Sequence, residues 1–155
     1  MENKVTSFFW FDNNLKEVIA YYRDIFNKGG KSHFEEIAYT LMSNAPGPRV
    51  ELATVQLFGN SYHFMGTKRY ANFNESVSLM ITTETQEETD YYWEAFTKEG
   101  KEIECGWCKD KYGLSWQITP KKLLELNTSK DKEVASYAMQ QMMKMKKIII
   151  KDLER

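Results

Sequence analysis

The sequence has little of what marks the specialised classes of protein. Two cysteines among 155 residues exclude a disulfide-stabilised scaffold, and three prolines exclude a proline-rich linker. Lysine and arginine total 21 against 22 acidic residues, so the basic excess that nucleic-acid binding needs is missing. No apolar run approaches the ~20 residues of a membrane-spanning helix. We therefore expect neither nucleic acid nor a membrane as a partner.

A hydrophobic leader is also missing, because residues 1–7 contain no apolar stretch of the kind that signal peptides carry. This predicts a cytoplasmic protein. What the chain does contain is 42% hydrophobic and 14% aromatic residues, which is enough for a packed core. The length suits one domain, so residues 1–155 are predicted to form a single domain.

An internal repeat organises the chain. Residues 21–26 (YYRDIF) resemble residues 91–96 (YYWEAF), and the offset is 91 − 21 = 70. The same offset pairs Gly30 with Gly100. Residues 59–64 resemble residues 113–118 at an offset of 113 − 59 = 54, so the second copy is 70 − 54 = 16 residues shorter. A deficit of that size predicts the loss of about one strand and a turn.

Each copy is predicted to run from a strand to a helix and then to further strands. In the first copy, Asn13 or Asn14 precedes a helix that ends at Gly29-Gly30, with strands at residues 5–11, 32–40, 50–57 and 61–65. A loop is expected at residues 44–48. In the second copy, Thr85 and Glu88 form a capping box before a helix that ends near Glu99, with strands at residues 76–83, 102–109 and 114–119. Helices follow at residues 121–126 and 130–146.

Four segments resemble a known family. They are residues 9–12 with Tyr22 and Phe26, residues 105–107, residues 109–118, and residues 142–148. Together they resemble the PhnB-like subfamily, often labelled 3-demethylubiquinone-9 3-methyltransferase, of the vicinal oxygen chelate superfamily. That superfamily includes glyoxalase I, extradiol dioxygenases and bleomycin-resistance proteins.

The resemblance implies an α+β fold in which two βαβββ-type modules form a cupped mixed sheet around a cavity. Here the modules would span about residues 4–67 and 75–119, followed by a C-terminal helical extension over about residues 120–155. It also implies a homodimer. Methyl transfer is not expected, because the sequence lacks the glycine-rich turn after a strand that such enzymes usually use, and Gly29-Gly30 lies at a helix end.

Metal-using members of the superfamily take their ligands from the first and last strand of each module. Here the first strands offer Ser7 and one of residues 76–78, and the last strands offer His63 and Gln117. Only His63 and Gln117 are plausible donors, and Gln117 is a neutral one. We therefore expect no metal and no other cofactor, with a divalent metal held by these two residues as the alternative.

Strand alternation gives a candidate pocket face. Gln117 brings Ser115, His63 brings Met65, and Ser7 brings Phe9 and Phe11, while Phe8 and Trp10 would pack under the helix. A one-residue slip would exchange these last two sets. Alternation near Cys105 adds Trp107. The complete candidate set is Ser7, Phe9, Phe11, His63, Met65, Cys105, Trp107, Ser115 and Gln117.

Three other features are assigned structural roles. Cys105 and Cys108 form a C-x-x-C pattern without a following helix, which favours two incidental reduced thiols. The methionines near residues 139–145 are expected to pack against the sheet or a sister subunit. The lysine-rich residues 144–151 are expected to dock on the protein rather than on a membrane.

The sequence thus predicts a PhnB-like protein that binds a small organic molecule in an aromatic pocket. The alternative is a divalent-metal-dependent lyase or isomerase of the glyoxalase type. A third possibility is a structural role, in which the protein's own side chains would fill the cavity. Whether the chain turns over a substrate stays open, and no catalytic residue is assigned.

Overall fold

The fold is taken from a computed structural model that describes residues 3–12, 14–42 and 47–155. The chain divides into two compact units, residues 1–71 and 72–155. This boundary falls between the two predicted modules. Asn13 and most of the loop predicted at residues 44–48 lie outside the described residues.

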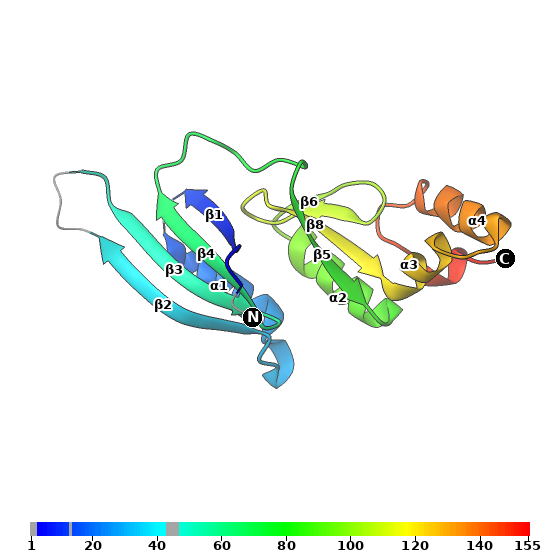
Figure 1. Cartoon of the computed structure of the whole chain (residues 1–155), viewed down its shortest axis with the longest axis horizontal. Coiled ribbons are helices and arrows are strands. Elements are labelled where there is room, and N and C mark those ends of the chain that lie inside the picture. Colours follow the sequence, from blue (N-terminus) through cyan, green and yellow to red (C-terminus); the bar gives the residue numbers. More distant parts are fainter. Residues whose placement is uncertain (1–2, 13, 43–46) are drawn as a thin grey trace. The chain divides into compact units, whose positions relative to one another are not determined.

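The first unit is a four-stranded sheet with one helix against it (Figure 1). Its elements are β1 (Ser7–Asp12), α1 (Leu15–Phe26), a 3-10 turn (Lys28–Gly30), β2 (Phe34–Met42), β3 (Val50–Leu57) and β4 (Asn60–Thr67). The strand order is β1-β4-β3-β2, and β1 runs parallel to β4 while the other neighbours are antiparallel. The connection from β1 to β4 therefore needs the intervening helix and hairpin.

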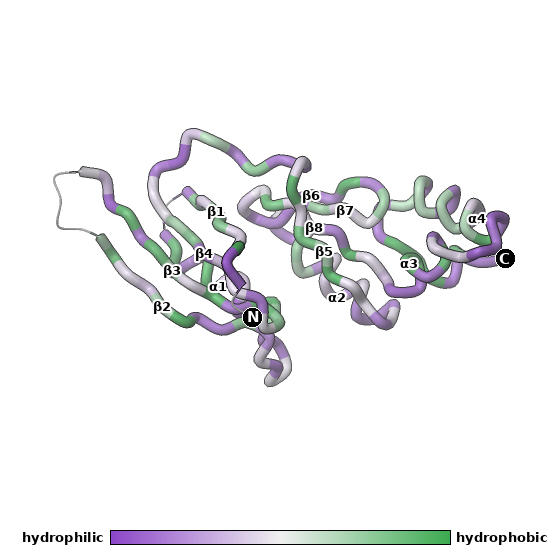
Figure 2. The backbone as a smooth tube through the Cα atoms, viewed as in Figure 1, coloured by the Kyte–Doolittle hydropathy of each residue, from purple (hydrophilic) through white to green (hydrophobic). Residues whose placement is uncertain are grey.

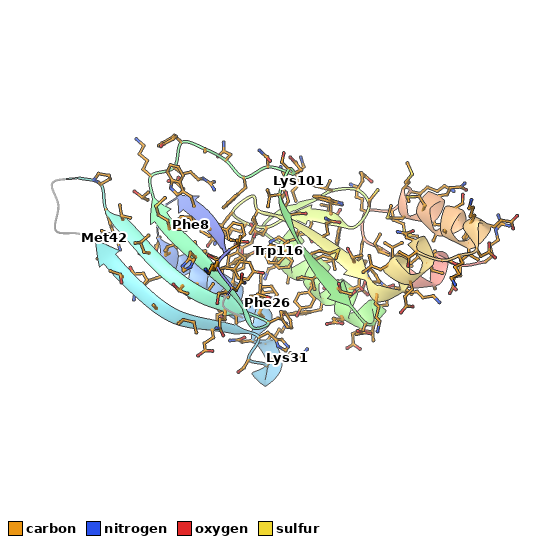
Figure 3. The ribbon with its side chains drawn as sticks, viewed as in Figure 1. Phe8, Phe26, Lys31, Met42, Lys101 and Trp116 are labelled. Atoms are coloured by element: carbon orange, nitrogen blue, oxygen red, sulfur yellow. The ribbon has the colours of Figure 1, made fainter. Side chains whose placement is uncertain are left out.

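Helix α1 begins where the sequence predicts and ends at Phe26, shortly before the predicted Gly29-Gly30. The side chain of Asn14 accepts a hydrogen bond from the backbone N–H of Glu17, and Gly29 adopts the left-handed conformation with φ 71° just after the helix. The apolar residues that recur at helical spacing are all buried: Leu15, Val18, Ile19, Tyr22 and Phe26. Figure 3 shows Phe26 near the end of this helix.

The second unit repeats the plan with β5 (Ser78–Thr83), α2 (Gln86–Thr97), β6 (Lys101–Glu102), β7 (Trp107–Lys109) and β8 (Ser115–Pro120). Its strand order is β5-β8-β7-β6, and β5 is parallel to β8. The predicted loss of a strand is wrong. All four strands are present, but β6 and β7 have 2 and 3 residues where β2 and β3 have 9 and 8.

The strand predicted over residues 102–109 is interrupted by a turn. Cys105 and Gly106 both have positive φ angles, 60° and 81°, which no extended strand allows. Their backbone N–H groups donate to the carbonyls of Met145 and Lys146, at 2.7 Å each. The turn therefore pairs with the C-terminal segment rather than with β6.

The C-terminal extension contains α3 (Lys121–Asn127), α4 (Lys132–Met142) and a last 3-10 turn (Ile150–Asp152). The tail docks on the protein, as predicted, because Ile148 and Leu153 are buried against Leu123, Leu126 and Ala138. Met142 and Met145 pack on the same cluster, while Met139 and Met143 are exposed. Helix α4 ends earlier than the predicted residue 146.

Hydrophobic and hydrophilic residues alternate along both units in Figure 2, without one long apolar segment. None of the helices within the described residues has the length and apolar character needed to cross a membrane. The architecture is a mixed α+β fold with two four-stranded mixed sheets and four α-helices among the described residues.

Candidate functional site

Each sheet has one face covered by its helix and an opposite face that the helix leaves open. In the first unit the covered face carries Phe9, Phe11 and Phe64. Phe11 contacts Tyr22 of α1 and Phe64, with ring centroids 6.2 and 4.9 Å apart. The open face carries the residues that alternate with these.

The prediction that Phe9 and Phe11 share a face with His63 is wrong. His63 is paired with Phe8 across β1 and β4, whereas Phe9 is paired with Phe64. Paired residues of neighbouring strands lie on the same face, so Phe9 and Phe11 belong to the core beneath α1. Ser7, two residues before Phe9 on β1, lies on the same face as Phe9 and Phe11. The structure thus has the alternative arrangement, shifted by one residue, in which Phe8 shares the face of His63. Phe9 and Phe11 lie under α1 because the helix buries the larger aromatic cluster.

His63 lies in a row of three side chains across the open face. Phe8 precedes it on β1, with the two ring centroids 6.4 Å apart, and Thr54 follows it on β3. The Thr54 Oγ1 atom lies 3.2 Å from His63 Nδ1. This hydrogen bond leaves Nε2 of the imidazole as the ring nitrogen available to another group.

A shallow hollow of about 220 Å³ lies on this face. Met65, another predicted pocket residue, lies two residues after His63 on β4 and therefore on the same face. It is paired with Trp10 on β1 and with Leu52 on β3. Sequence analysis missed Phe8, Thr54 and Leu52, because only the strand register shows which residues meet His63. The residues lining the hollow are Phe8, Ala38, Thr40, Leu52, Ala53, Thr54, His63 and Phe64. Phe8 is 57% exposed and is labelled on β1 in Figure 3.

On the second sheet, Gln117 occupies the middle of a corresponding row. It is paired with Met80 on β5 and with Trp107 on β7, and its Nε2 donates to Ser78 Oγ at 3.0 Å. Ser115 shares this face, as predicted. Trp116 points the other way and stacks on Phe96 of α2, with centroids 4.5 Å apart.

Cys105 does not join the face of Trp107, because the turn at residues 105–106 breaks the alternation. Both Cys105 and Cys108 are free thiols. Cys108 is buried in β7, and burial, together with the nearby charge of Asp110, raises the pKa of its thiol to about 12. A thiol of that pKa is protonated at neutral pH, so Cys108 is not an activated thiolate of the kind that a redox pair needs.

The donor set does not match a tight divalent-metal site. The row through His63 offers one imidazole between a phenyl ring and a hydroxyl, and the row through Gln117 offers one neutral amide already bonded to Ser78. Within residues 3–12, 14–42 and 47–155, no three His, Cys, Asp or Glu side chains gather closely enough to hold an ion. Such sites usually need three or four nitrogen, sulfur or carboxylate ligands.

Glu51 is a buried carboxylate that sequence analysis missed. Its Oε2 accepts from the backbone N–H of Leu15 at 3.1 Å, and its Oε1 accepts from the Tyr39 hydroxyl at 2.6 Å. The hydrogen bond to this carboxylate raises the pKa of the Tyr39 hydroxyl. Glu51 is paired with Gly66, where a Cβ atom would approach Leu15 Cγ to 2.7 Å. Glu51 thus anchors the start of α1 on the covered side of the sheet.

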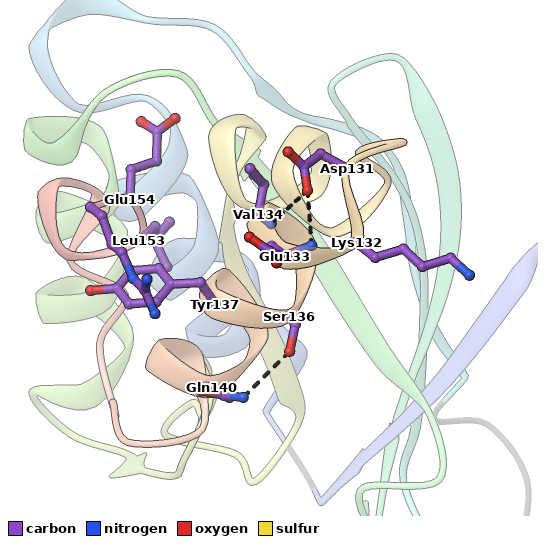
Figure 4. Close-up of a pocket in the computed structure, with 10 residues that line it drawn as sticks. Asp131, Lys132, Glu133, Val134, Ser136, Tyr137, Gln140, Leu153 and Glu154 are labelled. Atoms are coloured by element: carbon purple, nitrogen blue, oxygen red, sulfur yellow. Dashed lines mark hydrogen bonds between the residues drawn. The ribbon is translucent and has the colours of Figure 1, made fainter.

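A larger hollow of about 750 Å³ lies between α4 and the last residues of the chain (Figure 4). Asp131 caps α4 there by accepting from the backbone N–H groups of Glu133 and Val134. None of the predicted site residues lines it. Its lining comprises Asp131, Lys132, Glu133, Val134, Ser136, Tyr137, Gln140, Leu153, Glu154 and Arg155.

Comparisons with known proteins identify the fold and the family. A family model described as 3-demethylubiquinone-9 3-methyltransferase matches residues 3–119, which is more than half of the chain. A search of curated proteins gave no match. The PhnB protein of Bacillus cereus, described under the same methyltransferase name, is 29% identical with a TM-score of 0.60, over 76% of this chain and 99% of that one.

Two more distant structures share the fold. A protein from Pseudomonas aeruginosa is 15% identical, with a TM-score of 0.57 over 77% of this chain and 98% of its own. FosX, a fosfomycin resistance protein from Listeria monocytogenes, is 12% identical, with a TM-score of 0.56 over 81% of this chain and 96% of its own. The chain therefore belongs to the 3-demethylubiquinone-9 3-methyltransferase family, and its PhnB-type and FosX neighbours place its fold in the vicinal oxygen chelate superfamily, as the sequence predicted.

Proposed function

We propose that this protein binds a small, partly apolar organic molecule in the hollow on the open face of its first sheet. The observation that carries the proposal is the position of His63. Its imidazole lines the hollow together with apolar side chains and two threonines, and the hydrogen bond to Thr54 fixes its orientation. Ligand sites commonly combine apolar walls with a few placed polar groups.

The size of the hollow limits the ligand. Its volume of about 220 Å³ lies below the ~300–1,000 Å³ of common ligand pockets. A compact ring with one polar substituent would suit it better than a drug-sized molecule. Phe8 provides an exposed aromatic face against which such a ring can stack.

Binding can be measured by NMR with phenol, indole and cyclohexanone as compact ring probes. At least one probe is expected to shift the signals of His63 and Thr54. His63→Ala is expected to weaken that binding roughly tenfold, equal to about 1.4 kcal/mol, and Leu52→Trp to abolish it by filling the hollow. His33→Ala is the matched control, because His33 stacks on Phe58 outside the lining. Shifts that survive Leu52→Trp, or no shift with any probe, would refute the proposal.

His63→Ala also distinguishes the proposed binding protein from the metal-dependent alternative. A glyoxalase-type lyase requires about one divalent ion per chain that is lost in His63→Ala. Elemental analysis of the purified protein is expected to give no such stoichiometric, His63-dependent ion, because the donor set around His63 is too poor. A stoichiometric metal would favour the enzyme.

We further propose a homodimer in the cytoplasm. Strand β2 lies at the edge of its sheet and exposes Ile37, Leu41 and Met42 by 42–55%, and both thiols are free, as a reducing compartment requires. Figure 3 shows Met42 at the end of β2. In sedimentation velocity, Leu41→Lys is expected to give monomers while Leu124→Lys, an equally apolar position on α3, leaves dimers. Monomers of the unaltered protein at all concentrations would refute the dimer.

A further inference from the structure

A second group of polar side chains lies on the open face of the second sheet. Ser78 on β5, Ser115 on β8 and Lys109 on β7 are paired in one row. They lie on the face away from α2, because Trp116, the next residue along β8, stacks on a ring of that helix. All three groups can donate hydrogen bonds.

Ser115 is the unusual member of this row. Its side chain is fully buried, and its hydroxyl oxygen has no hydrogen-bond partner among the residues that the structure describes. Buried hydroxyls are nearly always bonded, because an unpaired one costs about 1–3 kcal/mol. A buried donor without a partner therefore points to a group from outside the protein.

The neighbours of Ser115 specify the chemistry of that group. Ser78 Oγ accepts from Gln117 Nε2 at 3.0 Å, so its own proton is free to be donated. Lys109 Nζ is 2.6 Å from the Glu75 carboxylate, and the Glu75 side chain is 54% exposed. The row thus presents two hydroxyls and the Lys109 ammonium, and this ammonium already forms an ion pair with the Glu75 carboxylate.

We propose that the row Ser78–Ser115–Lys109 binds the carboxylate of a small organic acid. One ligand oxygen replaces Glu75 on Lys109, and the other accepts from the Ser115 hydroxyl. Met80 and Trp107, which flank Gln117 in the adjacent row, provide an apolar surface for the rest of the molecule. Glu75 is exposed and precedes β5, so its side chain can leave without disturbing the sheet.

This site belongs to the second unit and does not depend on the hollow at His63. Benzoate is a suitable probe, and benzyl alcohol is its neutral counterpart of similar shape. Isothermal titration is carried out with Leu52→Trp, in which the hollow at His63 is filled. It is expected to detect benzoate and not benzyl alcohol at the same concentrations. The affinity for benzoate is expected to fall as salt rises, since the contact with Lys109 is ionic.

Substitutions in the row and at Glu75 are expected to change the affinity for benzoate in opposite directions. Ser115→Ala and Lys109→Gln are each expected to weaken benzoate binding roughly tenfold, the cost of losing a hydrogen bond to a charged group. Glu75→Gln is expected to strengthen it several-fold, because the competing carboxylate is gone. Lys111→Gln is the matched control, since Lys111 is ion-paired with Glu99 outside the row.

Thermal unfolding separates this role from a structural one. Ser115→Ala removes a buried hydroxyl that has no partner in the described part of the chain, so Tm is expected to stay level or rise while benzoate affinity falls. A lower Tm would show that the hydroxyl is bonded within the fold. Equal binding of benzoate and benzyl alcohol, unchanged affinity in Ser115→Ala, or weaker binding in Glu75→Gln would each overturn the proposal.

Discussion

The two units share a plan but not a surface. Both consist of a strand, a helix and three further strands, with the same pairing order. The side chains of Asn14 and Thr85 cap α1 and α2, and each accepts a hydrogen bond from the backbone N–H three residues later. The residues beneath the helices are also alike, since Tyr22 and Tyr92 are both buried. The open faces differ, with an imidazole row in one unit and a hydroxyl and lysine row in the other. The covered side maintains the fold, and the open side is where function can diverge.

The repeat-related glycines give the largest expected difference between the units. Gly30 has φ 80° and open space around it, whereas a Cβ atom at Gly100 would lie 1.9 Å from the Lys109 carbonyl oxygen and 2.6 Å from that of Phe96. Gly100→Ala is expected to lower the free energy of unfolding by about 3 kcal/mol or more, and Gly30→Ala by about 1 kcal/mol. Urea unfolding measures both. Equal losses would mean that the two glycines serve the same purpose.

These glycines illustrate what the repeat could and could not predict. The sequence offset pairs Gly30 with Gly100, but pattern alone does not distinguish a left-handed turn from a close backbone contact. The same limit explains the strand error. A deficit of 16 residues fits one lost strand as well as two shortened ones, and only the pairing of β6 with β7 decides between them.

The site was predicted less completely than the fold. Alternation correctly grouped Phe9 with Phe11 and Ser115 with Gln117, because residues two apart in a strand share a face. It does not say which face meets the helix, so Phe8 was placed on the wrong side. Glu51 was missed for a different reason: its partners Leu15 and Tyr39 are distant in sequence, and no local pattern marks a buried carboxylate that anchors a helix.

Removing that carboxylate tests how the first unit secures its helix. Glu51→Ala leaves the Leu15 N–H and the Tyr39 hydroxyl without their acceptor, and it opens space in a buried region. The expected loss is about 2–3 kcal/mol of unfolding free energy. Glu88→Ala is the counterpart in the second unit, where the carboxylate accepts from the backbone N–H of Glu84 on the surface, and should cost about 1 kcal/mol. A larger loss for Glu88→Ala would reverse the comparison.

The second unit depends instead on the C-terminal tail. The Gln86 side chain donates to the Ile148 carbonyl at 3.0 Å and accepts from the Ile150 N–H at 2.8 Å. Gln86→Ala is expected to cost about 1–2 kcal/mol and to increase amide hydrogen exchange in residues 145–153. Gln140→Ala is the control, because the Gln140 side chain donates to Ser136 on the surface of α4. Unchanged exchange in Gln86→Ala would show that the apolar cluster alone holds the tail.

High pH should give the smallest difference between the units, because the two largest upward pKa shifts belong to groups of the second unit, Cys108 and Tyr92. Burial raises the pKa of Cys108 from 9.0 to about 12 and that of Tyr92 from 10.0 to about 12. Above pH 9 the unfolded chain loses these protons before the folded protein does, so the free energy of unfolding should be fully retained below pH 9 and fall progressively toward pH 12.

Urea unfolding from pH 7 to pH 11 measures this slope. Cys108→Ala and Tyr92→Phe should each flatten it, and the double variant should flatten it further, after each curve is referred to its own value at pH 7. Referring each curve to pH 7 removes the packing cost of the substitutions, which does not change with pH. Curves parallel to that of the unaltered protein would mean that ionisation elsewhere, and not in the core of the second unit, limits alkaline stability.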